Sequence, residues 1–134
     1  MNRRLVIRSS AVAVAYLACG LGLAGCGSSG GGSSTDTIAP VQSGTVDISA
    51  TDNYFVPEDV AVTEGSDVVW TNEGRNQHNV VPVGPTPFGV DVGEFQPGQT
   101  FSWKAGAPGE YHYYCSIHGT ATAGMIGTIQ VVAP

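Results

Sequence analysis

Apolar and polar residues alternate along most of the chain from residue 45 onward. Val46 and Ile48 alternate with Asp47 and Ser49, which places the apolar side chains on one face of an extended strand. The same alternation recurs at residues 60–63, 68–70, 101–103 and 129–131. No stretch keeps a helical period over about ten residues, so the pattern predicts short β-strands rather than helices.

Turn-forming residues separate these alternating segments. They are clusters containing glycine or proline at residues 64–65, 72–74, 96–98 and 107–109. Such clusters mark turns and loops. Short strands at this spacing, each with one polar face, are typical of an antiparallel β-sandwich or barrel. The sequence therefore predicts an all-β fold, with one folded domain over residues 44–134.

The N-terminal segment differs in composition from the predicted domain. It begins with Arg3, Arg4 and Arg8 and continues as an apolar run over residues 11–24. This run is shorter than the about 20 apolar residues that a membrane-spanning helix needs. A cationic start followed by a short apolar run is typical of a signal peptide.

The apolar run ends in Leu23-Ala24-Gly25-Cys26, which resembles the lipobox of bacterial lipoproteins. In those proteins the signal peptide is cut before the cysteine, which then carries the lipid. The resemblance implies a signal peptide over residues 1–25, lipidation of Cys26, and a Gly/Ser-rich linker within residues 26–43. It also implies anchoring outside the cytoplasm to a bacterial membrane, at the cell surface or in the periplasm. Ordinary secretion, with a small-residue cleavage site and a chance cysteine, is the alternative.

The charge of the processed chain is strongly negative. Removing residues 1–25 leaves Arg75 and Lys104 against all 11 acidic residues, so the formal charge changes from −6 to −9. An acidic surface argues against nucleic-acid binding, which requires a basic patch. It favours association with a cationic partner protein through electrostatic steering. Solubility outside the cell is the alternative explanation of the charge.

The cysteines and methionines indicate a metal site near the C-terminus. Cys19 is removed with the signal peptide and Cys26 is assigned to the lipid, so Cys115 is the only free thiol. An unpaired cysteine in an oxidising compartment requires a reason. Cys115, His118 and Met125 lie within eleven residues of one another in a segment rich in glycine. They are candidate ligands of one ion, and His78, just past the turn that follows the strand around Trp70, is a candidate fourth.

These residue types suit copper better than other metals. Thiolate and thioether favour Cu(I), imidazole also suits Cu(II), and a His₂Cys set with a weak methionine contact serves both oxidation states. Zinc accepts His₂Cys as well, but structural zinc sites usually have more cysteines and catalytic zinc sites keep an open water position. The sequence therefore predicts one copper ion per chain, used as Cu(I) and Cu(II).

Residues 45–132 resemble a cupredoxin of the plastocyanin and pseudoazurin kind. The stretches that carry the resemblance are Phe55-Val56-Pro57, Val68-Val69-Trp70-Thr71-Asn72, His78-Asn79-Val80, Pro97-Gly98-Gln99-Thr100-Phe101, Gly109-Glu110-Tyr111-His112-Tyr113-Tyr114-Cys115-Ser116-Ile117-His118 and Gly124-Met125-Ile126-Gly127. The block Tyr-Tyr-Cys-x-x-His is the most specific of them. The resemblance implies a Greek-key β-sandwich that binds one copper ion at one end.

The resemblance also implies a role for each residue of the site. His78, Cys115, His118 and Met125 are the implied copper ligands. Asn79 is expected to brace the ligand loops by hydrogen bonding, with Ser116 as a partner, because such bonds hold ligand geometry.

The spacing between the last two implied ligands departs from the family pattern. Plastocyanins have four residues between the late histidine and the methionine, whereas residues 119–124 make six here. Met125 can still reach the metal. A backbone carbonyl near Gln77 is the alternative axial donor.

Strand parity predicts which side chains around Cys115 face the core. Tyr111, Tyr113 and Cys115 share one face of the segment 110–115, and this aromatic, uncharged face is expected to point inward. His112 then faces solvent, and Tyr114 faces outward beside the ligand strand. Trp70 and Trp103 are expected in the core.

The leading functional hypothesis is a monomeric one-electron carrier. His118 is expected at an exposed, apolar end of the molecule, where the redox centre of a partner can approach. A cationic redox protein, such as a cytochrome or a membrane oxidoreductase, is the expected partner. The alternative is an extracytoplasmic protein for copper delivery or storage, although the chain has no tract rich in methionine or histidine.

An enzyme is not expected. A nucleophilic pair of Cys115 and His118 requires an accessible thiol and a third group to orient the base, and no acidic residue lies in the ligand segment. A multicopper centre requires His-x-His motifs, which the chain lacks. A structural module such as an adhesion domain leaves the four candidate ligands unexplained.

Overall fold

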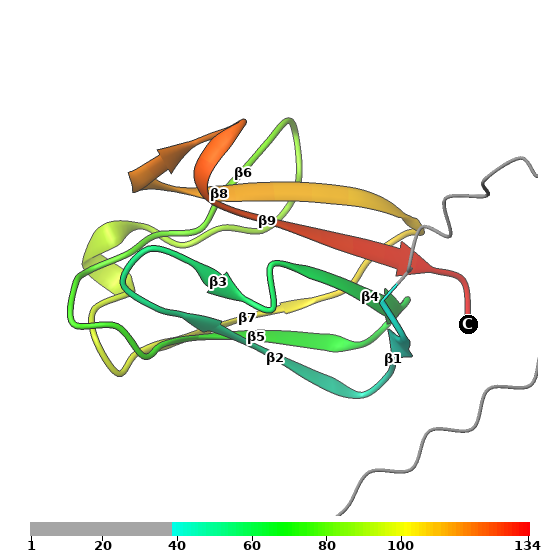
Figure 1. Cartoon of the computed structure of the whole chain (residues 1–134). Coiled ribbons are helices and arrows are strands. Elements are labelled where there is room, and N and C mark those ends of the chain that lie inside the picture. The colour runs from blue at the N-terminus through cyan, green and yellow to red at the C-terminus, as the bar shows by residue number, and fades with distance from the viewer. Residues whose placement is uncertain (1–38) are drawn as a thin grey trace, which may run out of the picture. The chain divides into compact units, whose positions relative to one another are not determined.

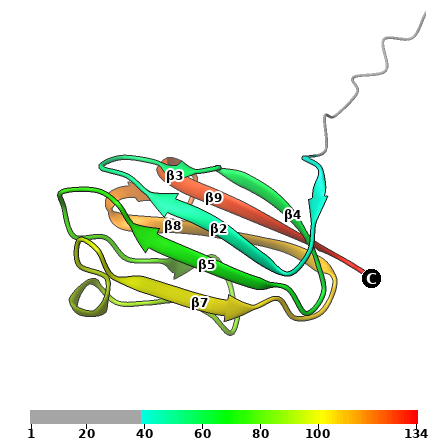
Figure 2. The same cartoon turned by 90° about the horizontal axis from the view of Figure 1, so that it is seen from below.

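The computed structural model describes residues 39–134, which form two stacked β-sheets (Figures 1 and 2). One sheet has five strands in the order β1-β4-β9-β8-β6 and the other has four in the order β3-β2-β5-β7. The signal peptide, Cys26 and most of the linker lie outside the described residues, so those assignments stay predictions. The elements are β1 (Val41–Gln42), β2 (Thr45–Ala50), β3 (Phe55–Val56), β4 (Asp59–Thr63), β5 (Asp67–Asn72), β6 (Val81–Pro82), the short 3-10 helix η1 (Val92–Glu94), β7 (Thr100–Lys104), β8 (Gly109–Thr120) and β9 (Ala123–Val132).

The expected all-β Greek-key sandwich is confirmed, but the expectation of purely antiparallel sheets is wrong. Strand β2 pairs in parallel with β5, and β4 pairs in parallel with both β1 and β9. After β2 and β3 the chain passes to the other sheet as β4, and then returns to place β5 beside β2. Parallel neighbours need such a crossover, because a tight hairpin can join only antiparallel strands.

Regular structure begins before Gly44, the expected start of the folded domain. Val41 pairs with Ala61 and Gln42 with Val62, so β1 extends the sheet along β4. Gly44 then has a φ of +79° in the turn into β2, a conformation that glycine adopts without a steric penalty.

The alternating pattern accounts for the core. In β2, Val46, Ile48 and Ala50 are buried whereas Asp47 is exposed. Trp70 lies at the centre with no exposed surface, and its ring packs against Phe88, Phe101 and Tyr113 at centroid distances of 5.4–5.7 Å. Trp103 is also buried. Full burial of a large apolar side chain stabilises the fold by about 1.5–3 kcal/mol.

The alternation of buried and exposed side chains along β8 is as expected. Tyr113 and Cys115 are buried, Tyr111 is half-buried, and His112 is exposed. The Tyr113 hydroxyl is buried with no hydrogen-bond partner among the described residues. Burial raises the pKa of this phenol well above its usual range. Strand β8 continues past Tyr113, and its last residues carry Cys115 and His118 to one end of the sandwich.

The pairing of β8 with β9 is interrupted near that end. The ladder runs to Tyr114↔Ile126 and resumes at Gly119↔Gly124. Residues 115–118 of β8 therefore lie opposite the single residue Met125 of β9. This bulge releases four residues from regular pairing and lets side chains of β8 and β9 turn toward a common point. Beyond the bulge the two strands continue as the hairpin at the end of the sandwich in Figure 1.

No helix within residues 39–134 is long and apolar enough to cross a membrane.

Candidate metal centre

Three of the predicted ligands converge at this end of the sandwich. The ligand atoms of His78, Cys115 and His118 all lie within 4.8 Å of one another. The Cys115 Sγ is 3.6 Å from the His78 Nδ1 and 3.7 Å from the His118 Nδ1. His78 comes from the loop after β5, 37 residues before Cys115, so the fold unites two distant segments.

These distances are those of ligands that share one ion. Metal–nitrogen and metal–sulfur bonds of about 2.0–2.3 Å, at angles between tetrahedral and trigonal, separate a sulfur and a nitrogen ligand by about 3.6–3.8 Å. Both histidines present the same atom, Nδ1, toward the thiol. The three side chains therefore fit a metal ion placed between them.

Burial prepares His78 to act as a ligand. Its side chain has no exposed surface, and this burial lowers its pKa from the usual value, with a further lowering from the nearby His118. Both effects favour the neutral imidazole, the form that a metal ligand must have. Its Nε2 is buried without a hydrogen-bond partner among the described residues.

Met125 joins these residues from the opposite strand. It is fully buried and belongs to the same core cluster as Cys115. Its place in β9, opposite the bulge that contains Cys115 and His118, directs it to the same region. The six residues between His118 and Met125 fold back on themselves as a hairpin. The longer spacing therefore does not move Met125 to the surface.

The family model for copper binding proteins, the plastocyanin/azurin family, matches residues 42–132. The chain belongs to this family. Its cofactor is one copper ion, and His78, Cys115, His118 and Met125 form a site of the type 1 copper kind.

Known relatives agree with this membership. The chain is 32% identical to a chloroplastic plastocyanin of Hordeum vulgare over 143 residues, which cover 97% of this chain and 84% of the relative. It is 37% identical to a plastocyanin of Vicia faba over 87 residues, which cover 58% of this chain and 86% of the relative.

Solved structures with the same fold include a plastocyanin and part of a nitrite reductase. A mutant fern plastocyanin has a TM-score of 0.55 and 25% identity, and the match covers 65% of this chain and all of that one. A Cu-containing nitrite reductase from Thermus scotoductus has a TM-score of 0.58 and 28% identity, and the match covers 67% of this chain but only 23% of the reductase.

In this member of the plastocyanin/azurin family, two hydrogen bonds join the ligand segments. The Asn79 Nδ2 donates to the Ser116 Oγ, and the Ser116 backbone N–H donates to the Asn79 Oδ1, both at 2.9 Å. Asn79 follows His78 and Ser116 follows Cys115. The pair therefore fixes the backbone next to one candidate ligand against the backbone next to another.

Asn72 is a second bracing residue, and the sequence analysis missed its role. Its carboxamide is buried, and the Nδ2 donates to the carbonyls of Asn76 and Phe95 at 3.0 and 2.9 Å. Its Oδ1 accepts from the Gly74 N–H. The Phe95 carbonyl also accepts the His78 N–H at 3.3 Å. One signal was available: parity puts Asn72 on the inward face of β5, where a polar side chain needs hydrogen-bond partners.

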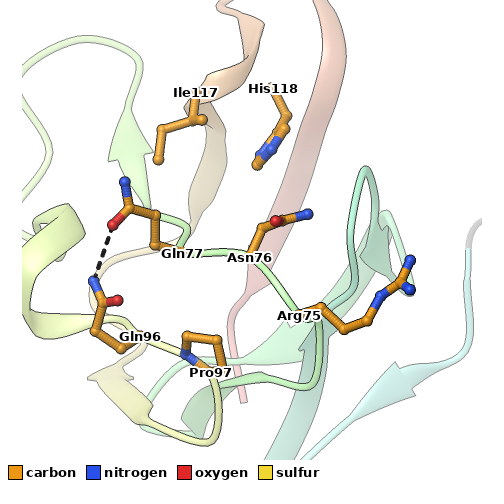
Figure 3. A pocket seen from close by; sticks show the side chains of 7 residues that line it. All are labelled: Arg75, Asn76, Gln77, Gln96, Pro97, Ile117 and His118. Atoms are coloured by element: carbon orange, nitrogen blue, oxygen red, sulfur yellow. Dashed lines mark hydrogen bonds between the residues drawn. The ribbon is translucent and has the colours of Figure 1, made fainter.

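His118 borders a groove of about 480 Å³ on the surface (Figure 3). Its other lining residues are Arg75, Asn76, Gln77, Gln96, Pro97 and Ile117. The expectation of an apolar surface around His118 is therefore wrong on this side, because the loop after β5 contributes an arginine and two amides. Two apolar residues also line the groove, Pro97 and Ile117, and 43% of the surface of Ile117 is exposed.

Proposed function

We propose that this protein is a one-electron carrier whose copper ion is held by His78, Cys115, His118 and Met125. Copper supplies a centre that alternates between Cu(I) and Cu(II) by a single electron, and this mixture of thiolate, imidazole and thioether suits both states. The observation that carries the proposal is the convergence of three donor atoms within 4.8 Å. Two segments braced by hydrogen bonds hold these atoms, so they have little freedom to rearrange when an electron arrives.

Electrons are proposed to pass through the edge of His118. Cys115, His78 and Met125 are fully buried, whereas His118 is only partly buried and borders the groove. A partner docked on the groove approaches the centre more closely there than over the buried ligands. The amides of Asn76, Gln77 and Gln96 offer this partner hydrogen bonds.

A cationic redox protein is the proposed partner of this monomeric carrier. Residues 39–134 contain ten acidic residues, and their two strong cations are paired, Arg75 with Asp52 and Lys104 with Asp67. The remaining negative charge steers a positively charged cytochrome or membrane oxidoreductase toward the protein. Its association rate should fall with increasing salt, because salt screens exposed charges.

The proposed location is the outer face of a bacterial membrane, with the lipid on Cys26. The lipobox-like residues 23–26 support this proposal. Replacing Cys26 by serine in the expressing cell should move the protein from the membrane fraction to the soluble fraction. Retention in the membrane fraction would count against a lipid anchor at this residue.

Catalysis by Cys115 and His118 is left out of the proposal. The Cys115 side chain has no exposed surface, so its thiol is closed to a substrate. Within residues 39–134 no carboxylate hydrogen-bonds to His78 or His118 to orient them as bases.

The test is the visible absorption spectrum of the purified protein after addition of one equivalent of Cu(II). An intense blue band from thiolate-to-copper charge transfer is expected, and Cys115→Ser should abolish it. Voltammetry of the blue protein should then be fast and reversible. A pale complex would contradict Cys115 as a ligand. A blue protein that readily gives its copper to a chelator would favour delivery or storage instead.

A further inference from the structure

The hairpin between His118 and Met125 contains two glycines that face each other across the strands. Gly119 pairs with Gly124, and this pair is where the ladder of β8 and β9 resumes after the bulge. Gly119 directly follows His118, and Gly124 directly precedes Met125. The glycine pair therefore closes the bulge that contains Cys115 and His118 on one strand and Met125 on the other.

The two backbones approach so closely that neither position has room for a side chain. A Cβ on Gly119 would lie 2.6 Å from the Met125 backbone nitrogen and 2.8 Å from the Ala123 carbonyl oxygen. A Cβ on Gly124 would lie 2.6 Å from the His118 carbonyl oxygen. Gly124 also has a φ of +87°, which side chains disfavour. All three obstructing atoms belong to the backbone, so none can move aside as a flexible side chain would.

We propose that Gly119 and Gly124 are positioning residues that set the place of Met125 at the copper centre. Their contact fixes the backbone nitrogen of Met125 against the backbone beside His118. The additional length of this segment is then displaced outward, into the tip formed by residues 120–123. The inference rests on the proposed copper site, and it adds that close backbone contact, rather than the length of the segment, determines where Met125 lies.

The turn at the tip, residues 121–122, supplies none of these contact atoms. Thr120 pairs with Ala123, and residues 121–122 form the turn between them. All four are exposed. Among the residues that the structure describes, Thr120 is the only one of these four whose side chain takes part in a hydrogen bond, at 3.4–3.5 Å. Changes within the turn should therefore leave Met125 in place.

The first test is Gly119→Ala in the full protein loaded with copper. The added methyl group must push β9 away, so the copper spectrum and the reduction potential should both shift. Copper affinity, measured by competition with a chelator, should fall about 10-fold, the lower end of the range for groups that hold ligands in place. Gly106→Ala is the matched control, because its Cβ meets nothing within 4 Å. An unchanged spectrum and potential in Gly119→Ala would overturn the proposal.

A double-mutant cycle tests whether Gly119 acts through Met125. In a Met125→Leu background, Gly119→Ala should cause little further shift in potential, because the group that it displaces is already absent. An equal shift in both backgrounds would mean that Gly119 acts through the fold or through His118, and would overturn the assignment.

A third variant keeps both glycines, so it tests the proposal even if the glycine substitutions prevent folding. Inserting Gly-Ser between Ala121 and Thr122 lengthens the segment at its exposed turn. The spectrum and potential should not change, whereas a change would show that segment length places Met125. If the unaltered protein shows no blue band, the proposed copper site fails first. If the unaltered protein is blue and the variants contradict the expectations, only the role of the glycines fails.

Discussion

The two segments that carry the copper ligands are held in place by opposite means. Buried amides hold the early segment: Asn72 bonds to three backbone groups, and Asn79 bonds to Ser116. Glycines hold the late segment, because Gly119 and Gly124 let the two strands touch. An irregular loop has free backbone polar groups that side chains must satisfy. On either side of the bulge the paired strands satisfy those groups themselves and need only the space to approach, and inside the bulge the Ser116 N–H bonds to Asn79.

The largest effect is expected from removing the central amide of the early segment. Asn72→Ala removes the hydrogen bonds that the Asn72 side chain donates to the carbonyls of Asn76 and Phe95. Because each lost hydrogen bond costs about 1 kcal/mol and the variant loses three, the free energy of unfolding of the copper-free protein should fall by about 3 kcal/mol. Urea denaturation measures this change. Asn76→Ala, which alters an exposed asparagine in the same loop, should have little effect. Equal losses in the two variants would remove Asn72 from its bracing role.

A smaller effect is expected when the late hairpin is overpacked. Gly127 lies under the ring of Tyr113, and a Cβ there would overlap the Tyr113 Cζ. Forcing a methyl group into a packed core typically costs about 1–3 kcal/mol. Gly127→Ala should therefore lower the thermal midpoint clearly, whereas Gly106→Ala should not. A normal midpoint for Gly127→Ala would mean that the core can shift to admit the methyl group.

The hydrogen bonds between Asn79 and Ser116 link the two ligand segments. Their contribution to stability should be smaller than that of the contacts within either segment. Ser116→Ala removes the acceptor of the Asn79 Nδ2 but keeps the bond from the Ser116 backbone N–H. Loss of this single hydrogen bond should reduce the free energy of unfolding by about 1 kcal/mol. The copper spectrum should shift as well, because both ligand segments are connected there. Ser102→Ala, on the exposed face of β7, is the control. A shift of the same size in that control would contradict a specific link.

The smallest effect concerns the exposed edge of the early segment. Asp52 accepts a hydrogen bond from the Arg75 backbone N–H at 2.7 Å and pairs with the Arg75 guanidinium, which lowers the pKa of this carboxyl below 3.8. A lowered pKa means that the carboxylate stabilises the fold above about pH 4 and loses this contribution as the pH falls through its folded value. The stability difference between the unaltered protein and Asp52→Asn should therefore be small at pH 7 and smaller at pH 3. A difference that grows in acid would contradict this assignment.

The sequence predicted the strands, the inward face of β8 and the three residues that converge. These features depend on local alternation or on close spacing, which the residue order records. The parallel neighbours of β4 and β5 were missed, because a period of two indicates which face is buried but not which strand lies beside it. The role of Asn72 was missed because one of its acceptors, Phe95, lies 23 residues away. The sequence did not predict the polar groove, because the amides that line it come from two loops that only the folded structure brings together.

The unpartnered hydroxyl of Tyr113 has a consequence for how the protein withstands oxidation. This tyrosine lies two residues before Cys115 on the same face and belongs to an aromatic cluster with Trp70 and Phe55. Oxidation of a phenol normally requires release of its proton, and within residues 39–134 no acceptor for that proton lies within hydrogen-bond reach. Loss of an electron from this ring is therefore disfavoured, so the phenol should stay intact while the copper changes its oxidation state.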